Sequence, residues 1–195
     1  MKKLLFVPLM LILIGCSKVI PESNTNNITE FILPSDQFAF FEHTDFRIQY
    51  PVSFETLKQN QLETKFSNDA QVAFVSNLKS AFFTSNIVVE KIKVAPNLTS
   101  TLFAESIIEN NKKQLNTYTE LDRKTVTSFV NGSPVTTILI RFTARLELSS
   151  DLVEYVQTYL TDGTNGYVAT AAYDPVDPNL EAEKLIDSLK TFILK

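Results

Sequence analysis

The chain has one cysteine, Cys16, and one histidine, His43, among its 195 residues. A single cysteine cannot form a disulfide within the chain, so the stability of the fold has to come from packing. Zinc sites that need several cysteine and histidine ligands are excluded. A catalytic triad that needs histidine would have to use His43. Because there are only four glycines, a glycine-rich phosphate-binding loop is not expected either.

Tryptophan and an excess of positive charge are also missing. Without tryptophan, the 15 phenylalanines have to supply most of the aromatic bulk of the core. Lysine and arginine number 18 against 22 aspartate and glutamate residues, which gives a net charge of −4. Nucleic-acid binding requires a basic surface that neutralises phosphates, so nucleic acid is not an expected partner. The hydrophobic share of 44% is typical of an ordinary globular domain.

The N-terminus has the pattern of an export signal. Lys2 and Lys3 precede an apolar run over residues 4–14, and the small residue Gly15 follows this run. A helix that spans a bilayer needs about 20 apolar residues. The shorter run is therefore interpreted as part of a signal peptide, residues 1–15, that is removed on export.

The four residues Leu13-Ile14-Gly15-Cys16 resemble the lipobox of bacterial lipoproteins. The resemblance implies that the thiol of Cys16 is the lipid attachment site, that the peptide is cut before it, and that fatty acyl chains such as palmitate anchor the protein. The location implied is the cell envelope, on the extracytoplasmic side of a membrane. Ser17 in place of aspartate resembles sorting to the outer membrane where a cell has two membranes. A plain secretory signal with an incidental cysteine is the alternative.

Three parts are expected along the chain: the signal peptide, a lipid-anchored flexible linker over residues 16–37, and a folded domain over residues 38–195. The linker is polar, contains prolines and has no sustained apolar period. A flexible segment of this length reaches about 25 Å on average. It would lift the domain off the lipid headgroups without fixing its orientation.

Alternating apolar and polar residues predict that the domain is rich in strands. Strands are expected at residues 38–42, 46–50, 71–76, 86–94, 125–130, 135–146, 152–161 and 167–173, and amphipathic helices at 101–115 and 179–193. Residues 57–68 are interpreted as a loop or an irregular helical turn. Asn131-Gly132 predicts a type I′ hairpin turn, which Ser133-Pro134 could lengthen. Short turns join consecutive strands in antiparallel pairs, so we expect an α+β fold, a mainly antiparallel β-sheet sandwiched by helices.

Three stretches resemble the PsbP-like family, which includes the extrinsic lumenal subunit of photosystem II and bacterial lipoproteins. They are Phe46-Arg47-Ile48-Gln49-Tyr50-Pro51 followed by Phe54, the Asn131-Gly132 hairpin, and residues 167–171 leading to 186–192. The resemblance implies an antiparallel sheet sandwiched by helices, in agreement with the pattern. Phe54 stands where the family usually has tryptophan. The metal-site histidines of photosynthetic members have no counterpart here, so neither metal binding nor a photosystem role is transferred.

Two sets of polar residues are considered as candidate cation sites. Residues 162–166 have the composition of a calcium loop but lack its alternating acidic positions and distal glutamate, so a plain turn is favoured. Asp151, Glu154, Asp174 and Asp177 could gather into a weak cation site, but turn formation or capping explains each of them better. We therefore expect no metal ligand and no cofactor.

The expected function is binding without catalysis. Arg141 and Arg145 share one face of a strand, where an anionic ligand or cross-strand carboxylates could pair with them; the second is favoured. No serine lies in a Gly-x-Ser-x-Gly setting. The first hypothesis is thus a membrane-tethered binding or assembly module with a protein partner in the envelope. The alternative is a carrier or sensor of a small apolar ligand. An enzyme, which would use His43 or a carboxylate pair, is not expected.

Overall fold

The computed structural model describes residues 29–78, 83–177 and 182–195. These residues form three helices and one ten-stranded sheet in the order β1-β2-β10-β6-β7-β8-β9-β5-β4-β3. The strands are β1 (Phe38–Glu42), β2 (Phe46–Pro51), β3 (Phe54–Thr56), β4 (Ala70–Ser76), β5 (Asn86–Lys93), β6 (Asn116–Val130), β7 (Ser133–Arg145), β8 (Val153–Thr161), β9 (Asn165–Tyr173) and β10 (Ile193–Leu194). The helices are α1 (Gln59–Lys65), α2 (Ser100–Gln114) and α3 (Ala182–Lys190).

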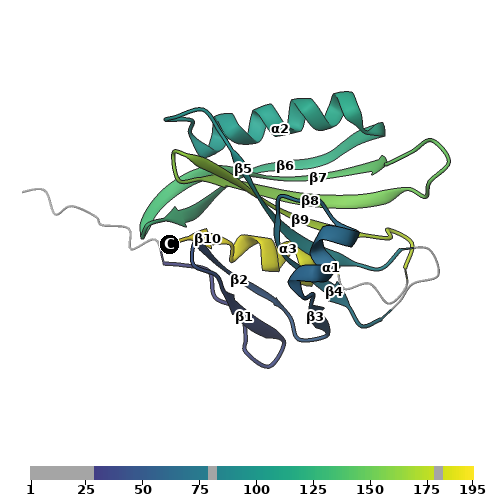
Figure 1. Ribbon diagram of the computed structural model, residues 1–195, viewed down its shortest axis with the longest axis horizontal. Helices are drawn as coiled ribbons and strands as arrows, with labels where there is room; N and C mark the ends of the chain where they lie inside the picture. Colours follow the sequence, from purple (N-terminus) through teal and green to yellow (C-terminus); the bar gives the residue numbers. More distant parts are fainter. Residues whose placement is uncertain (1–28, 79–82, 178–181) are drawn as a thin grey trace, which may run out of the picture.

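The sheet is curled, and a helix lies on each of its faces (Figure 1). α2 packs on one face over β7 and β8, and α3 packs on the other face between the central strands and β2. Within the described residues, neighbouring strands are antiparallel except β10 and β6, which pair in parallel. The predicted α+β class with a mainly antiparallel sheet between helices is confirmed.

Strand β7 contributes side chains to the hydrophobic clusters on both faces of the sheet, because its successive side chains point to alternate faces. Ile138, Ile140 and Phe142 are buried in the cluster under α2, whereas Leu139 is buried in the cluster around α3. Leu146, the first residue after β7 ends at Arg145, is 63% exposed.

The predicted hairpin turn is confirmed in detail. Asn131 and Gly132 have φ angles of 51° and 73°, the two positive values that a type I′ turn requires. Val130 pairs directly with Ser133, so Ser133-Pro134 does not lengthen the loop. β6 starts at Asn116, well before the expected residue 125, because its polar first half pairs with the far end of β7.

Two predicted segments differ from the structure. The closing helix ends at Lys190 and not at residue 193, since Ile193–Leu194 form β10 between β2 and β6. The Thr191 hydroxyl donates to the Ser188 carbonyl (2.6 Å) and accepts from the Gln49 backbone N–H (2.8 Å), which draws the chain out of the helix and into the sheet. The expected start of this helix at residue 179 lies outside the described residues. α1 forms where a loop or irregular turn was expected, because Leu62 is buried against β4.

The N-terminal part of the described chain contacts the domain before β1 begins. The backbone N–H of Leu33 donates to Gln49 Oε1 (2.8 Å), and Gln49 Nε2 donates to the Leu33 carbonyl (3.1 Å). Glu30 forms an ion pair with Arg47 of β2. Residues 30–33, which fall within the linker expected from the sequence, thus lie against β2. Cys16 and the expected signal peptide lie outside the described residues, and no helix within those residues has the length and apolar character to cross a membrane.

Candidate binding groove

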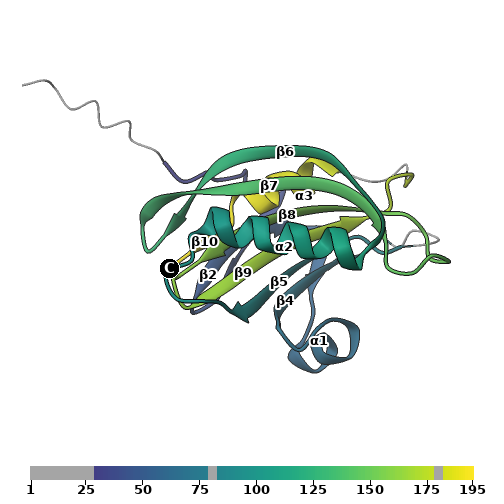
Figure 2. The same ribbon diagram turned by 90° about the horizontal axis from the view of Figure 1, so that it is seen from above.

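A groove of about 410 Å³ lies on the α2 face of the sheet, between the C-terminal ends of α1 and α2. Its lining comes from both helix ends, the chain before β5, and strands β5, β7, β8 and β9 with the residue after β7: Lys65, Phe66, Ser67, Phe83, Asn86, Val88, Glu90, Asn111, Leu115, Phe142, Leu146, Tyr155, Gln157, Thr170 and Ala172. Figure 2 shows α1 and α2 set apart over this face, with β5 and β9 running beneath the space between them.

Packing of the two helices leaves this strip of the sheet uncovered. α1 is held by Leu57 and Leu62, which pack on Ala73 and Val88 in a small cluster of their own. α2 packs on β7 and β8 through a separate cluster that includes Phe103. The groove between α1 and α2 (hereafter the groove) is the region between these two clusters.

The floor of the groove carries a row of polar side chains. Asn111 Nδ2 donates to Gln157 Oε1 (2.9 Å), and the Tyr159 hydroxyl donates to the same oxygen (2.7 Å). Gln157 Nε2 donates to Thr170 Oγ1 (3.0 Å), and Gln157 is only 9% exposed. In this arrangement the Gln157 oxygen accepts two hydrogen bonds and its nitrogen donates one. The groove therefore combines apolar walls with a few oriented hydrogen-bonding groups, as small-molecule and peptide sites commonly do.

Aromatic rings form the part of the groove next to β7 and β8. Phe142 stacks on Tyr155 with ring centroids 5.1 Å apart, and on its other side it stacks on Tyr118 at 4.8 Å. Burial raises the pKa of Tyr155 above its ordinary value. The Tyr155 hydroxyl consequently stays protonated at neutral pH and can act as a hydrogen-bond donor.

Apolar surface continues beyond the groove. A second hollow of about 230 Å³ shares Phe83 with the groove and is lined further by Asp151, Leu152, Asp174, Pro175 and Val176. Two large apolar side chains at these hollows are strongly exposed, Leu146 of the groove at 63% and Val176 of the second hollow at 78%. Large apolar groups that gather at a hollow are typical of interaction sites, whereas scattered ones need no explanation.

The arginines and acidic residues singled out from the sequence are placed as follows. Arg141 pairs with Glu154 through Nη2 and Oε1 (2.6 Å), which confirms the cross-strand interpretation; Tyr173 also donates to this carboxylate. For Arg145 the expected carboxylate partner was wrong, because its guanidinium donates to the Ser150 backbone carbonyl in the turn after β7. Asp151 and Asp174 lie at the second hollow, apart from the Glu154 ion pair. In the part of the chain that the structure describes, no group of three or more acidic, histidine or cysteine side chains could hold a metal ion.

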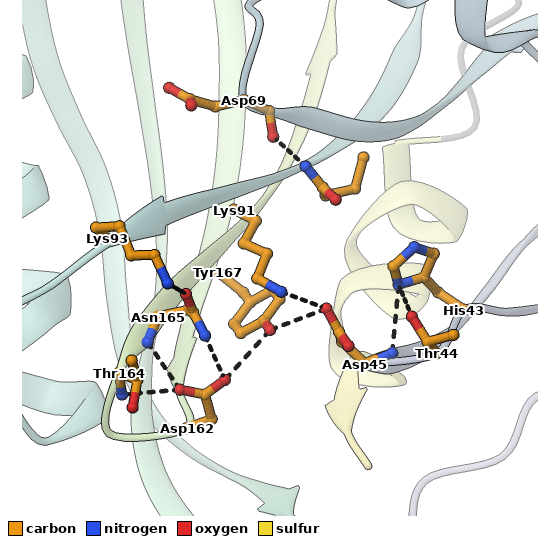
Figure 3. A network of polar contacts seen from close by, with 11 residues as sticks. His43, Thr44, Asp45, Asp69, Lys91, Lys93, Asp162, Thr164, Asn165 and Tyr167 are labelled. Atoms are coloured by element: carbon orange, nitrogen blue, oxygen red, sulfur yellow. Dashed lines mark hydrogen bonds and ion pairs between the residues drawn. The ribbon is translucent and has the colours of Figure 1, made fainter.

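His43 lies in a polar network at the end of the sheet where the β1–β2 hairpin turns (Figure 3). Its ring stacks on Phe46 at 4.6 Å, and its Nδ1 lies 3.3 Å from the backbone nitrogen of Asp45. Asp45 forms an ion pair with Lys91 of β5 (2.5 Å), and the Tyr167 hydroxyl of β9 lies 3.2 Å from the same carboxylate. The network therefore links the β1–β2 hairpin to strands β5 and β9.

The electrostatics of this network fit a structural role. Hydrogen bonding to Lys91 lowers the pKa of Asp45, and the same bond raises the pKa of Lys91. Burial raises the pKa of Tyr167 to about 12. Asp162 lies 3.3 Å from the Tyr167 hydroxyl and accepts from the backbone N–H groups of Thr164 and Asn165. Residues 162–164 form a turn, as expected, but β9 already begins at Asn165, so the turn is shorter than the predicted 162–166.

Sequence reasoning did not find the groove. It brings Gln157 and Thr170 of the β8–β9 hairpin together with Asn111 of α2, which lies far from them in the chain, and the three carry no common motif. Leu146 and Leu152, which lie at the groove and the second hollow, were expected only as the ends of two strands.

Comparisons with known proteins support the fold. No family model and no curated protein matches the sequence. Among solved structures, the cyanobacterial PsbP protein CyanoP from Synechocystis sp. PCC 6803 is similar with a TM-score of 0.54 at 9% identity, over 84% of this chain and 95% of that chain. PA94 of Pseudomonas aeruginosa, a protein of unknown function, has a TM-score of 0.41 at 12% identity, over 72% of this chain and 85% of its own. The similarity to CyanoP shows that the fold is PsbP-like.

Proposed function

We propose that the protein is a lipid-anchored lipoprotein of the cell envelope and a non-catalytic binding module. It acts on the extracytoplasmic side of a membrane, the outer membrane where there are two. It binds a segment of an envelope protein in the groove between α1 and α2. The lipobox-like residues before Cys16 support the anchor. Each buried methylene contributes about 0.8 kcal/mol, so several acyl chains hold a net acidic domain without a polybasic segment.

The groove is the observation that carries the binding proposal. It is open to solvent and continues into the second hollow past Phe83, so its shape suits an extended segment better than a compact molecule. The amides of Gln157 and Asn111 carry donors and acceptors of the kind that match the N–H and C=O groups of a peptide backbone. A bound segment would exchange some of the hydrogen bonds that these amides already make on the groove floor for its own. Leu146 and Val176 offer apolar contacts for alternate side chains of that segment.

A small apolar ligand is the second candidate. The volume of about 410 Å³ falls within the range of roughly 300–1,000 Å³ that is common for ligand pockets. In this candidate the apolar walls hold the ligand, and the Gln157 amide orients its polar end.

The anchor is tested on the native protein. Mass spectrometry of the mature chain should find acyl groups on Cys16, and Cys16→Ser should move the protein from the membrane fraction to the soluble fraction. A native protein with an unmodified Cys16 or an uncut leader would contradict the anchor. It would leave the groove proposal standing.

The groove is tested with photo-crosslinking side chains placed at two exposed leucines. Leu146 lines the groove and is 63% exposed, whereas Leu102, in the first turn of α2, is 58% exposed and does not line it. The Leu146 position should yield an adduct with one defined peptide, the Leu102 position should not, and Gln157→Leu should reduce the yield. An adduct of small-molecule mass supports the second candidate. Equal labelling from both positions would rule out a specific site in the groove.

A further inference from the structure

Three large apolar side chains are exposed at the place where the chain enters the domain. Phe31 is 48% exposed, Ile32 is 63% exposed and Phe40 of β1 is 49% exposed. They lie around one small surface hollow, together with Arg47 and Thr191. We refer to Phe31, Ile32 and Phe40 as the entry patch.

The entry patch is held in place by the contacts of the segment before β1. Leu33 exchanges two hydrogen bonds with the side chain of Gln49, and Leu33 itself is buried. Arg47 pairs with Glu30, and its guanidinium lies over the Phe40 ring, 5.9 Å from the centroid. The segment therefore lies against β2 from residue 30 onward.

These contacts limit how far the patch can move from the proposed anchor. Residues 17–29 separate Cys16 from the docked segment, and a flexible chain of this length has an average reach of about 20 Å. Along the chain, Phe31 and Ile32 are the first large apolar side chains of the described domain after that anchor. A patch confined this close to a surface meets it at a high effective concentration, so weak contacts suffice.

From this placement we infer that the entry patch rests on the lipid bilayer, in contact with the headgroup and upper acyl region. The inference rests on the proposed acylation of Cys16. Aromatic and aliphatic side chains partition into this interfacial region, and long basic side chains beside them reach the headgroups. Lys190, whose ammonium lies 5.8 Å from the centroid of the Phe31 ring, and Arg47 are the basic side chains next to the patch.

Contact at the entry patch would orient the groove away from the membrane. Figure 1 shows the chain entering the domain at the end near the C-terminus, whereas the β7–β8 loop lies at the opposite end. That loop carries Leu148, and the groove-lining Leu146 directly follows β7. A partner in the periplasmic or extracellular space would then approach an exposed groove.

The absence of tryptophan and the single cysteine allow a direct test. The mature chain, starting at Cys16, is coupled through its thiol to a maleimide phospholipid in phosphatidylcholine vesicles, with or without lipids brominated on their acyl chains. Phe31→Trp places the only fluorophore of its kind in the patch, and Leu148→Trp places it in the β7–β8 loop as a matched control. Tryptophan at 31 should emit at shorter wavelength and be quenched by the brominated lipid. Tryptophan at 148 should do neither.

A second variant separates specific contact from proximity. Adding Ile32→Ser and Phe40→Ser to Phe31→Trp should remove most of the quenching, whereas adding Val52→Ser, another exposed apolar position at 55%, should not. Equal quenching at 31 and 148, or none at 31, overturns the inference. Because the anchor is supplied chemically, this outcome is independent of whether the cell acylates Cys16.

Discussion

Replacing Gly166 by alanine should push α2 away from the sheet. A Cβ at this position in β9 would lie 2.4 Å from Cζ of Phe103 and 2.7 Å from Cε2 of the same ring. Phe103 is 1% exposed, and its ring meets Tyr159 edge-on at 6.2 Å. The ring therefore cannot move aside into solvent, and either the strand or the helix has to shift.

The size of the effect follows from overpacking. Extra methyl groups in a well-packed core cost about 1–3 kcal/mol, and a clash with a buried ring places Gly166→Ala near the upper end, at about 2–3 kcal/mol. For a domain of this size, that corresponds to a fall in Tm of roughly 4–12 °C. The groove should suffer as well, because the C-terminal end of α2 forms one of its walls through Asn111 and Leu115.

Thermal unfolding of the mature chain, followed by circular dichroism, measures this effect. Phe103→Leu alone should destabilise the protein by about 1 kcal/mol or more through a cavity, but in the Gly166→Ala background it should restore part of the loss. Strictly additive effects of the two substitutions would refute the clash. Gly163→Ala is the control: Gly163 has a φ of +90° and no atom within 4 Å of the added Cβ, so its strain should not respond to Phe103→Leu.

Three further predictions concern polar groups. Asp45→Asn should cost up to about 1 kcal/mol at pH 7, since both partners are partly exposed. A lowered pKa of Asp45 and a raised pKa of Lys91 mean that this difference, measured by urea unfolding, should vanish as the pH falls below about 4 or rises above about 10.5. Arg141→Met should cost about 2 kcal/mol or more, because it leaves the Glu154 carboxylate, 9% exposed, without its cation; adding Glu154→Gln should recover most of this loss in the same assay. Tyr118→Phe should raise Tm, because the buried Tyr118 hydroxyl has no hydrogen-bond partner among the described residues; a fall in Tm would contradict this reasoning.

The local sequence pattern correctly predicted the elements that are specified by one apolar face or by one turn motif. The alternation of Ile138, Ile140 and Phe142 identified β7, and Asn131-Gly132 identified its turn, because both signals lie within a few residues. Helix α2 was found in the same way from its apolar stripe.

The elements missed from the sequence depend on contacts with distant parts of the chain. The first half of β6 is polar and mostly exposed, and only its pairing with β7 makes it a strand. β10 has two residues and forms because Thr191 bonds to Gln49, which lies far away in sequence. The apolar spacing predicted a helix to residue 193, because Phe192 and Ile193 continue the apolar stripe of α3.

The groove could not be predicted for a related reason, which the length of α1 makes clear. A helix of seven residues is about 10 Å long, whereas the eight residues of β5 extend about 26 Å. α1 thus covers less than half of the length of these strands and packs on β4, while α2 packs on β7 and β8, so side chains of β9 such as Thr170 and Ala172 are left to line the groove. Because residues 57–68 were expected to form a loop or an irregular helical turn, no regular helix was predicted whose length could be compared with that of the strands. The groove results from a short α1 and a separate α2 that pack on different strands of the sheet, and no motif encodes it.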